Sequence, residues 1–202
     1  MNETNHTELR ARAINGEADA QFELGQCCER GLGEDLSYNE AMLWYLKAAQ
    51  SGLAKAEYSI GLLYEHGRGV DQDYIQAKNW YQKAAEKGDP WAQNNLGFLY
   101  SHGHGVEASD ELALEWYRKA ASQGHFQAQF NIAARYARGD GFEVNLIEAH
   151  FWFKRSMLGA TAVDQARAEK TLEYLEEHMT EQDITAAKTL FADRLIDPNF
   201  AP

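Results

Sequence analysis

The sequence predicts an all-α fold in which helix pairs stack into a solenoid, with further helices at both ends. Tryptophan recurs with a period of 36 residues, and glycine keeps the same period. The members are Trp44, Trp80, Trp116 and Trp152, with Gly16, Gly52, Gly88 and Gly124. A fixed period of this length is typical of arrays built from copies of one small unit. Helical spacing of apolar residues within each copy indicates that the unit is a pair of helices.

The period divides the chain into three segments. Residues 1–15 precede the array, and within them residues 6–15 predict a short helix that covers the first copy. Residues 16–158 hold four copies, at 16–51, 52–87, 88–123 and 124–158. Residues 159–202 follow the array and depart from its pattern, as the ends of repeat proteins do.

The first helix of each copy contains a small residue in its middle. In the second copy, Ala56, Ile60, Gly61 and Tyr64 recur at helical spacing. A glycine inside a helix costs about 1 kcal/mol relative to alanine. Because Gly25, Gly97 and Ala133 stand at the equivalent positions, we expect another helix to cross closely there.

The two helices of each copy are joined by a G-x-G turn, followed by a residue that favours a helix N-cap. These residues are Ser37, Asp73, Ser109 and Asn145. Three residues further on, Glu40, Gln76 and Glu148 predict a reciprocal capping box in three of the copies. The pattern therefore places the start of every second helix.

The second helix of each copy alternates large rings with alanines, which allows neighbouring helices to interlock. We expect the ring of Trp80 to be buried, so that Trp80→Ala would cost about 3–5 kcal/mol. The helices are expected to end at C′ glycines, namely Gly52, Gly88, Gly124 and Gly159. Asp89 and Pro90 predict an N-cap followed by proline at the first helical position.

Two helices are expected after the array. The first, within residues 159–179, carries an apolar stripe that consists of Ala168, Leu172, Leu175 and Met179. Thr180 and Asp183 predict the capped start of a last helix, whose apolar residues are Ile184, Ala187, Phe191 and Leu195. The final residues, 197–202, are expected to be frayed.

Composition excludes several classes of function. The formal net charge is −12, concentrated at the two ends of the chain, and such a surface repels nucleic acid. No stretch approaches the roughly 18 consecutive apolar residues of a membrane span. The N-terminal segment has no apolar core of a secretory signal, which favours a cytoplasmic location. The adjacent Cys27 and Cys28 are expected to be buried free thiols, because neighbours on a helix cannot form a disulfide.

Motifs for catalysis, cofactors and metals are missing. The chain has no phosphate-binding loop, no H-E-x-x-H helix and no C-x-x-C pair. The turn histidines His66 and His102 occupy equivalent positions about 10 Å apart, too far for one zinc ion. His104 adds only a second ligand beside His102. We therefore expect no catalytic residues, no cofactor and no metal site.

The repeat pattern A-x-x-x-L-G-x-x-Y-x-x-G-x-G-V-x-x-D-x-x-x-A-x-x-W-Y-x-K-A-A closely resembles the Sel1-like repeat, a relative of the tetratricopeptide repeat. The resemblance covers residues 16–158, and the first and fourth copies depart from it at Cys28, Glu34 and 155–157. It implies a right-handed α/α superhelix whose first helices line a concave face. It also implies an adaptor that binds other proteins. Some secreted members hold each helix pair with a disulfide, and this chain lacks those cysteines.

By this resemblance, one concave row contains aromatic side chains and a second row runs beside it. The candidate contacts are Phe22, Tyr58, Leu62, Trp91, Asn94, Phe98 and Phe130. Rings supply contact area at low entropic cost, which suits a groove for a peptide or a helix. An aromatic row also fits packing within the repeats. Trp91 and Phe98 are less typical of the pattern and are the better candidates for exposed contacts.

The sequence predicts a non-enzymatic module that binds a protein or peptide partner, and a basic partner would suit its charge. A weaker candidate dock is the acidic face formed by Glu173, Glu176 and Glu177, which is also explained as a solvated face. One alternative function is an immunity or inhibitor protein that neutralises a toxin. Another is a small-ligand binder or an enzyme, and self-association is a further possibility.

Overall fold

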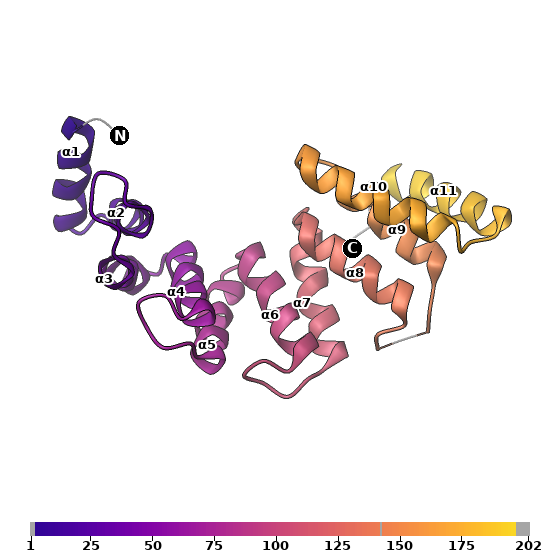
Figure 1. Ribbon diagram of the computed structural model, residues 1–202, viewed down its shortest axis with the longest axis horizontal. Coiled ribbons are helices and arrows are strands. Elements are labelled where there is room, and N and C mark those ends of the chain that lie inside the picture. Colours follow the sequence, from indigo (N-terminus) through magenta and orange to yellow (C-terminus); the bar gives the residue numbers. More distant parts are fainter. Residues whose placement is uncertain (1–2, 142, 197–202) are drawn as a thin grey trace. The chain divides into compact units, whose positions relative to one another are not determined.

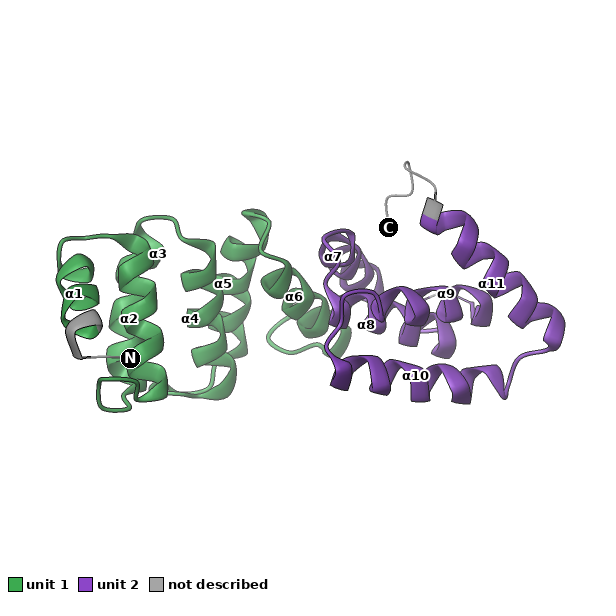
Figure 2. Ribbon diagram, turned by 90° about the horizontal axis from the view of Figure 1, so that it is seen from above, with its two compact units in different colours: residues 1–108 green, residues 109–202 purple. Residues whose placement is uncertain are grey.

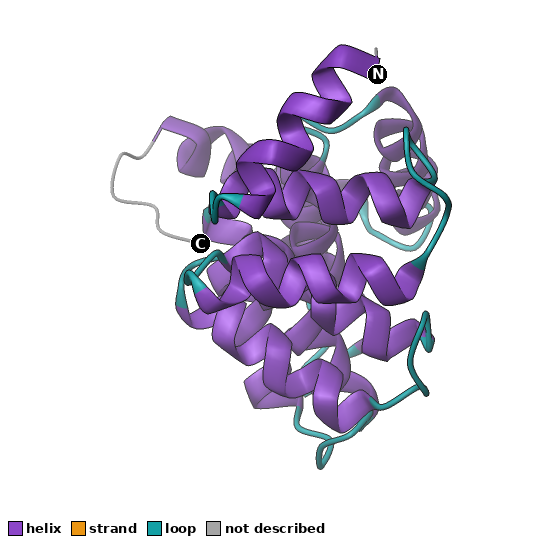
Figure 3. Cartoon of the chain, turned by 90° about the vertical axis from the view of Figure 1, so that its left-hand side faces the viewer, coloured by secondary structure: helices purple, strands orange, loops and turns teal. Residues whose placement is uncertain are grey.

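The computed structural model describes residues 3–141 and 143–196, which form eleven α-helices and no strand (Figures 1 and 3). The helices are α1 (Glu3–Ile14), α2 (Ala18–Arg30), α3 (Tyr38–Gln50), α4 (Ala54–His66), α5 (Tyr74–Glu86), α6 (Pro90–His102), α7 (Asp110–Ser122), α8 (Phe126–Arg138), α9 (Leu146–Ser156), α10 (Ala162–Glu176) and α11 (Glu181–Ile196). The tail at 197–202, expected to be frayed, lies outside the described residues. None of the helices is both long and apolar enough to cross a membrane.

The helices form two compact units, residues 1–108 and residues 109–202 (Figure 2). In the first unit each helix from α1 to α6 packs on the next one. In the second unit α7 packs on α8 and α8 on α9, whereas α10 and α11 both pack on α9. Each unit is therefore a stack of helices with a local core.

The N-terminal helix α1 covers the first repeat. Its Leu9 and Ala13 are 5% and 1% exposed and pack against Ala20, Leu24 and Cys27 of α2. Burial of these apolar side chains between the two helices is the main stabilising term at this end of the chain.

The predicted N-caps of the second helices are confirmed, but the reciprocal half of the capping box is wrong. The side chain of Ser37 accepts a hydrogen bond from the Glu40 backbone N–H at 3.2 Å. The backbone N–H of Ser37, however, donates to the Cys28 carbonyl at the end of α2. The N–H groups of Asp73 and Asn145 likewise donate to the preceding helix. These N–H groups are therefore not available to the side chains of Glu40, Gln76 and Glu148, which were predicted to accept from them.

The predicted Thr180–Asp183 capping box does form, at the start of α11. The Thr180 hydroxyl accepts from the Asp183 N–H at 3.1 Å, and the Thr180 N–H donates to the Asp183 carboxylate at 3.4 Å. The Thr180 N–H thus donates to a side chain of its own helix, whereas the Ser37 N–H donates to a carbonyl of the preceding helix.

Three of the four predicted C′ glycines are confirmed. The fourth, Gly159, is wrong, because α9 ends at Ser156 with Met157 as its C-cap, which places Leu158 at C′. At the end of α3, the Gly52 N–H donates to the Ala49 carbonyl and the Leu53 N–H donates to the Ala48 carbonyl. This pair of bonds is a Schellman motif. The same bonds recur at the ends of α5 and α7, with Gly88 and Gly124 at the C′ position. The predicted Asp89 cap is also present, because its carboxylate accepts from the Ala92 N–H at 2.8 Å.

In the first two repeats, the glycine in the middle of the first helix marks a close helix crossing, as predicted. A Cβ atom at Gly61 would lie 2.5 Å from the ring of Tyr81 on α5, and one at Gly25 would lie 2.6 Å from Tyr45 on α3. Tyr45 and Tyr81 are completely buried. The glycine therefore provides the space for a tyrosine of the second helix.

The expected burial of Trp80 is wrong, because its neighbour Tyr81 occupies the core. Trp80 is only partly buried, and the ammonium of Lys83 lies 3.8 Å from its ring centroid. Lys47 and Lys119 cover Trp44 and Trp116 in the same way. In the first three repeats, this lysine stands three residues after the tryptophan and shields the ring through a cation–π contact.

The G-x-G turn lets one repeat approach the previous one closely. Gly105 has φ +67°, and a Cβ atom there would lie 2.6 Å from the backbone carbonyl carbon of Tyr74. Glycine accepts both the left-handed conformation and the close contact with the start of α5. The turn is thus a point of contact between successive repeats within the first unit.

A glutamine links the first helix of the first, third and fourth repeats, and also α10, to the helix before it. These bonds were not predicted from the sequence. Gln93 Nε2 donates to the Ala85 carbonyl at 3.1 Å. Equivalent bonds are made by Gln21, Gln129 and Gln165. In the second repeat Glu57 takes this place, and Lys87 donates to both its carboxylate and the Gly52 carbonyl. The lysine thus supplies the donor that the glutamate lacks.

The second unit ends with α10 and α11 against α9. Ala168, Leu172 and Leu175 of α10 are buried as predicted. Leu195 of α11 is 52% exposed, contrary to its expected place on the buried stripe. Its neighbour Arg194 turns toward α9 instead, where it pairs with Glu148 and lies 4.8 Å over the Phe151 ring.

Candidate partner-binding surface

The aromatic row predicted on the first helices is used largely for packing. Phe22 and Phe130 are 7% and 8% exposed, and Asn94 is 7% exposed. The Phe22 ring lies 5.5 Å from Tyr45, and the Phe130 ring lies 5.0 Å from Phe153. These three side chains therefore offer little surface, and the predicted set of contacts narrows to the other four residues.

Tyr58 of α4 belongs partly to this packing row. Its ring lies 5.7 Å from that of Tyr81. Burial raises the pKa of the Tyr58 hydroxyl to about 12, so it stays protonated at neutral pH.

The α6 helix presents a stripe of exposed rings. Trp91 is 56% exposed and Phe98 is 37% exposed. Trp91, Phe98 and His102 follow at spacings of seven and four residues, so they lie on one face of the helix. Asn95 lies on the same face, between the two large rings. We call this set, Trp91, Asn95, Phe98 and His102, the α6 aromatic face.

The large rings of the α6 aromatic face are specific to the third repeat. At the position of Trp91 the other repeats carry Asp19, Lys55 and Gln127. At the position of Phe98 they carry Gln26, Leu62 and Ala134. Since the same backbone is built without these rings three times, the fold does not require them.

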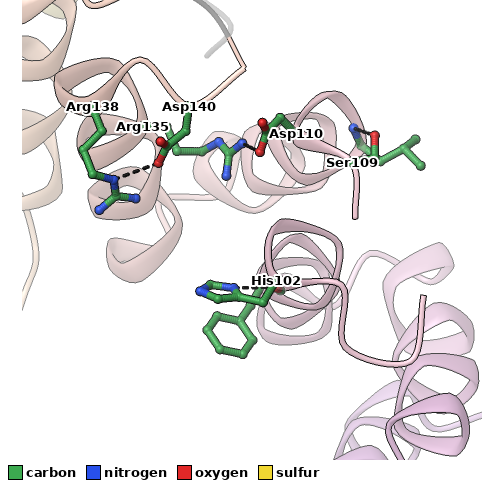
Figure 4. A network of polar contacts seen from close by, with 8 residues as sticks. His102, Ser109, Asp110, Arg135, Arg138 and Asp140 are labelled. Atoms are coloured by element: carbon green, nitrogen blue, oxygen red, sulfur yellow. Dashed lines mark hydrogen bonds and ion pairs between the residues drawn. The ribbon is translucent and has the colours of Figure 1, made fainter. Parts of the chain in front are cut away.

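Neighbouring rings hold Phe98 in place. Its centroid lies 4.2 Å from that of His102, whose Nδ1 is 3.0 Å from the Phe98 carbonyl oxygen (Figure 4). His104 from the following turn stacks on His102 at 5.7 Å and on Tyr74 of α5 at 4.7 Å. We call these four residues the ring cluster: Phe98, His102, His104 and Tyr74. The other three rings therefore fix the orientation of the exposed Phe98.

The acidic face predicted on α10 is smaller than expected. Glu173 and Glu177 are exposed. Glu176 lies 2.8 Å from Nε2 of the fully buried His150 on α9. Burial lowers the pKa of His150, so the neutral ring donates to the carboxylate. The Glu176 carboxylate therefore links α10 to α9, and only Glu173 and Glu177 remain as candidates for the acidic dock.

Comparison with known proteins identifies the repeat. The Sel1 repeat model matches residues 18–53, 54–89, 92–125 and 126–156. The chain belongs to the Sel1 repeat family. Its fold class is accordingly an α/α superhelix of repeats, as predicted.

Two solved structures are similar to this Sel1 repeat protein. One is a protective antigen of uropathogenic Escherichia coli with an SLR fold; it is 38% identical, covers 79% of the chain and has a TM-score of 0.74. The other is a Sel1 repeat protein from Oxalobacter formigenes, which is 32% identical, covers 84% and has a TM-score of 0.76. The chain spans 34% and 66% of the lengths of these proteins. No curated protein matches the sequence.

Sel1 repeat proteins are generally modules for protein interaction, and the fold is typically a non-enzymatic scaffold. Within the described residues, no group of three or more histidine, cysteine, aspartate or glutamate residues is placed to hold a metal ion. Cys27 and Cys28 are buried free thiols, and burial raises the pKa of Cys28 to about 11. The Cys28 thiol therefore stays protonated at neutral pH and is a poor nucleophile.

Proposed function

We propose that this Sel1 repeat protein binds a protein or peptide partner through the α6 aromatic face, with Tyr58 and Leu62 of α4 beside it. One observation carries the proposal: Trp91 and Phe98 are large, exposed and absent from the equivalent positions of the other repeats. Exposed aromatic rings that the fold does not need are typical anchors of interfaces.

The ring cluster supports the proposal because it reduces the cost of binding. Phe98 is already held by His102 and His104 before a partner arrives. A side chain fixed in this way loses little conformational entropy on association. The α6 helix carries no Asp, Glu, Lys or Arg, so an apolar segment of a partner would meet no desolvated charge there.

The net charge of −12 favours a basic partner through long-range attraction. Electrostatic steering of this kind raises the association rate more than the affinity. We therefore expect a partner with an apolar anchor for α6 and a basic surface around it, and we expect its association to slow as salt is added.

The test is affinity capture from native lysate with a variant that copies residues of the chain's own repeats. Trp91→Gln introduces the residue of Gln127, and Phe98→Gln introduces that of Gln26, so the double variant should fold. Leu43→Asn is the matched control, because Leu43 is 60% exposed on α3 and Asn79 stands at the equivalent position.

We expect a partner that is retained by the wild type and by the Leu43→Asn control but lost by the folded double variant. Its identity then separates an adaptor from an inhibitor of a toxin. Equal capture by all three proteins would refute a role for the α6 aromatic face.

A further inference from the structure

A pocket of about 370 Å³ lies between α8, α9 and α10 in the second unit. Its floor is apolar and is formed by Ala134 and Ala137 of α8, Phe153 of α9 and Leu175 of α10. Arg138, Tyr174 and His178 are exposed at its rim. The volume falls within the range of sites that bind small molecules or side chains.

The pocket exists because the fourth repeat has smaller or less polar side chains at three positions that other repeats fill with larger or polar ones. Ala134 stands where Leu62 and Phe98 stand in the second and third repeats. In the second repeat, the Tyr81 hydroxyl donates to the carboxylate of Glu65. At these two positions the fourth repeat has Phe153 and Ala137, so neither polar partner remains and the space is apolar.

An arginine stands near the pocket on each of α8 and α10, although the chain as a whole is acidic. The α8 helix carries no acidic residue. Of its two arginines, Arg135 is buried and pairs with Asp110 of α7, whereas Arg138 lines the pocket. Arg138 Nε donates to Asp140 at 2.7 Å (Figure 4), and its guanidinium has further donors. The Arg138 side chain is 64% exposed, so those donors are accessible at the rim.

The α10 helix adds a second arginine to this side. Arg167, Tyr174 and His178 follow at spacings of seven and four residues and thus share one face of α10. The Arg167 guanidinium lies 4.5 Å over the Phe130 ring of α8, which places it between the two helices. By the same periodicity Glu173 points roughly 120° away from this face of α10, and Glu176 is bonded to His150 of α9.

We propose that this pocket binds one large apolar side chain of a partner peptide whose neighbouring residues are acidic. The ring or branched chain is buried against Ala134, Phe153 and Leu175, and the flanking carboxylates pair with Arg138 and Arg167. This site lies in the second unit and prefers the charge opposite to that expected at the α6 aromatic face. It therefore stands independently of the proposed function.

The experiment uses the full chain and three capped pentapeptides as probes. The first has one phenylalanine between glutamates, the second has the same phenylalanine between lysines, and the third has alanine between glutamates. Methyl NMR signals of Ala134, Ala137 and Leu175 report the location of binding. We expect saturable shifts of these signals with the first probe, about tenfold weaker binding of the lysine probe, and no shifts with the alanine probe.

Two variants test the two halves of the site. Ala134→Leu restores the residue of Leu62 and fills the pocket, so it should abolish binding of the first probe. Arg138→Gln keeps the pocket and should reduce the preference for the acidic probe about fivefold. The Trp91→Gln/Phe98→Gln protein and an Ala186→Leu protein are the controls, and both should bind as the wild type does.

The proposal is overturned if the pocket methyl signals do not shift, or if Ala134→Leu binds the acidic probe unchanged. Equal binding of the acidic and basic probes would overturn the assigned partner chemistry. Binding that appears only after residues 197–202 are removed would assign the pocket to the chain's own tail. Concentration-dependent dimerisation that Ala134→Leu abolishes would assign it to a second copy.

Discussion

The third and fourth repeats use the same backbone positions for different chemistry. The third repeat fills one set of positions on α6, in the first unit, with the rings of Phe98 and His102. At the equivalent positions the fourth repeat has Ala134 and Arg138, and Arg138 pairs with Asp140. Meanwhile the second helix of both repeats starts at a polar N-cap, Ser109 in the third repeat and Asn145 in the fourth. The repeat therefore separates a constant scaffold from a small set of positions that determine what each unit exposes.

The largest expected effect comes from breaking the constant scaffold. Tyr81→Ala removes a completely buried ring and should lower the free energy of unfolding by about 3–5 kcal/mol. Trp80→Ala should cost clearly less, because its ring is only partly buried. Urea-induced unfolding followed by circular dichroism measures both. An equal loss for the two variants would contradict the assignment of Tyr81 as the core ring.

The next effect concerns an ion pair that distinguishes the fourth repeat. Arg135 is 2% exposed and pairs with Asp110 of α7 (Figure 4), whereas Leu99 and Tyr74 stand at the equivalent positions in the first unit. Asp110→Ala should cost about 2–3 kcal/mol, because it removes the carboxylate from a buried guanidinium.

The matched double variant is Arg135→Leu with Asp110→Tyr, which restores the residues of the first unit. Its free energy of unfolding should lie within about 1 kcal/mol of the wild-type value, because apolar packing often replaces a buried ion pair without a loss of stability. If the double variant were less stable than Asp110→Ala, the Leu and Tyr side chains of the first unit would not be able to replace the Arg135–Asp110 ion pair in the second unit.

A smaller effect is a pH dependence of the free energy of unfolding, which arises because the N-cap residue differs between α6 and α8. Asp89 caps α6, whereas His125 caps α8 and accepts from the Ala128 N–H at 3.3 Å. Burial lowers the pKa of His125 to about 4. The unfolded chain therefore binds a proton below about pH 6.5 that the folded chain does not bind until about pH 4.

Stability should consequently fall as the pH is lowered through this window, by about 2 kcal/mol from His125 at pH 5. His125→Asn keeps a capping acceptor that does not titrate. We expect its free energy of unfolding to change less than that of the wild type between pH 7 and pH 5. The same change in both proteins would exclude His125 as the source.

The sequence predicted the local features of the fold well and the non-local ones poorly. Helix starts at Ser37 and stops at Gly52 depend on a few neighbouring residues, and both were found. The capping-box partners failed because the Ser37 N–H is taken by α2. Periodicity also could not decide which of the adjacent Trp80 and Tyr81 enters the core, because that depends on the space left by Gly61.

For the candidate surface, the comparison of repeats was informative where a large side chain had been added. Trp91 and Phe98 stood out because other repeats have smaller or polar residues there, and both are exposed. Phe22 and Phe130 were buried by rings of their partner helices, which no single-helix pattern reveals. The pocket was missed because it arises from absent side chains at Ala134 and Ala137, and because α10 lies outside the repeats.

The most direct test of the account places a photoreactive benzophenone amino acid at position 98, and separately at position 43, in the native cell. If the α6 aromatic face is the binding surface, irradiation should give a covalent adduct of the partner from position 98 and none from position 43. Adducts from position 43, or equal adducts from both positions, would contradict the account.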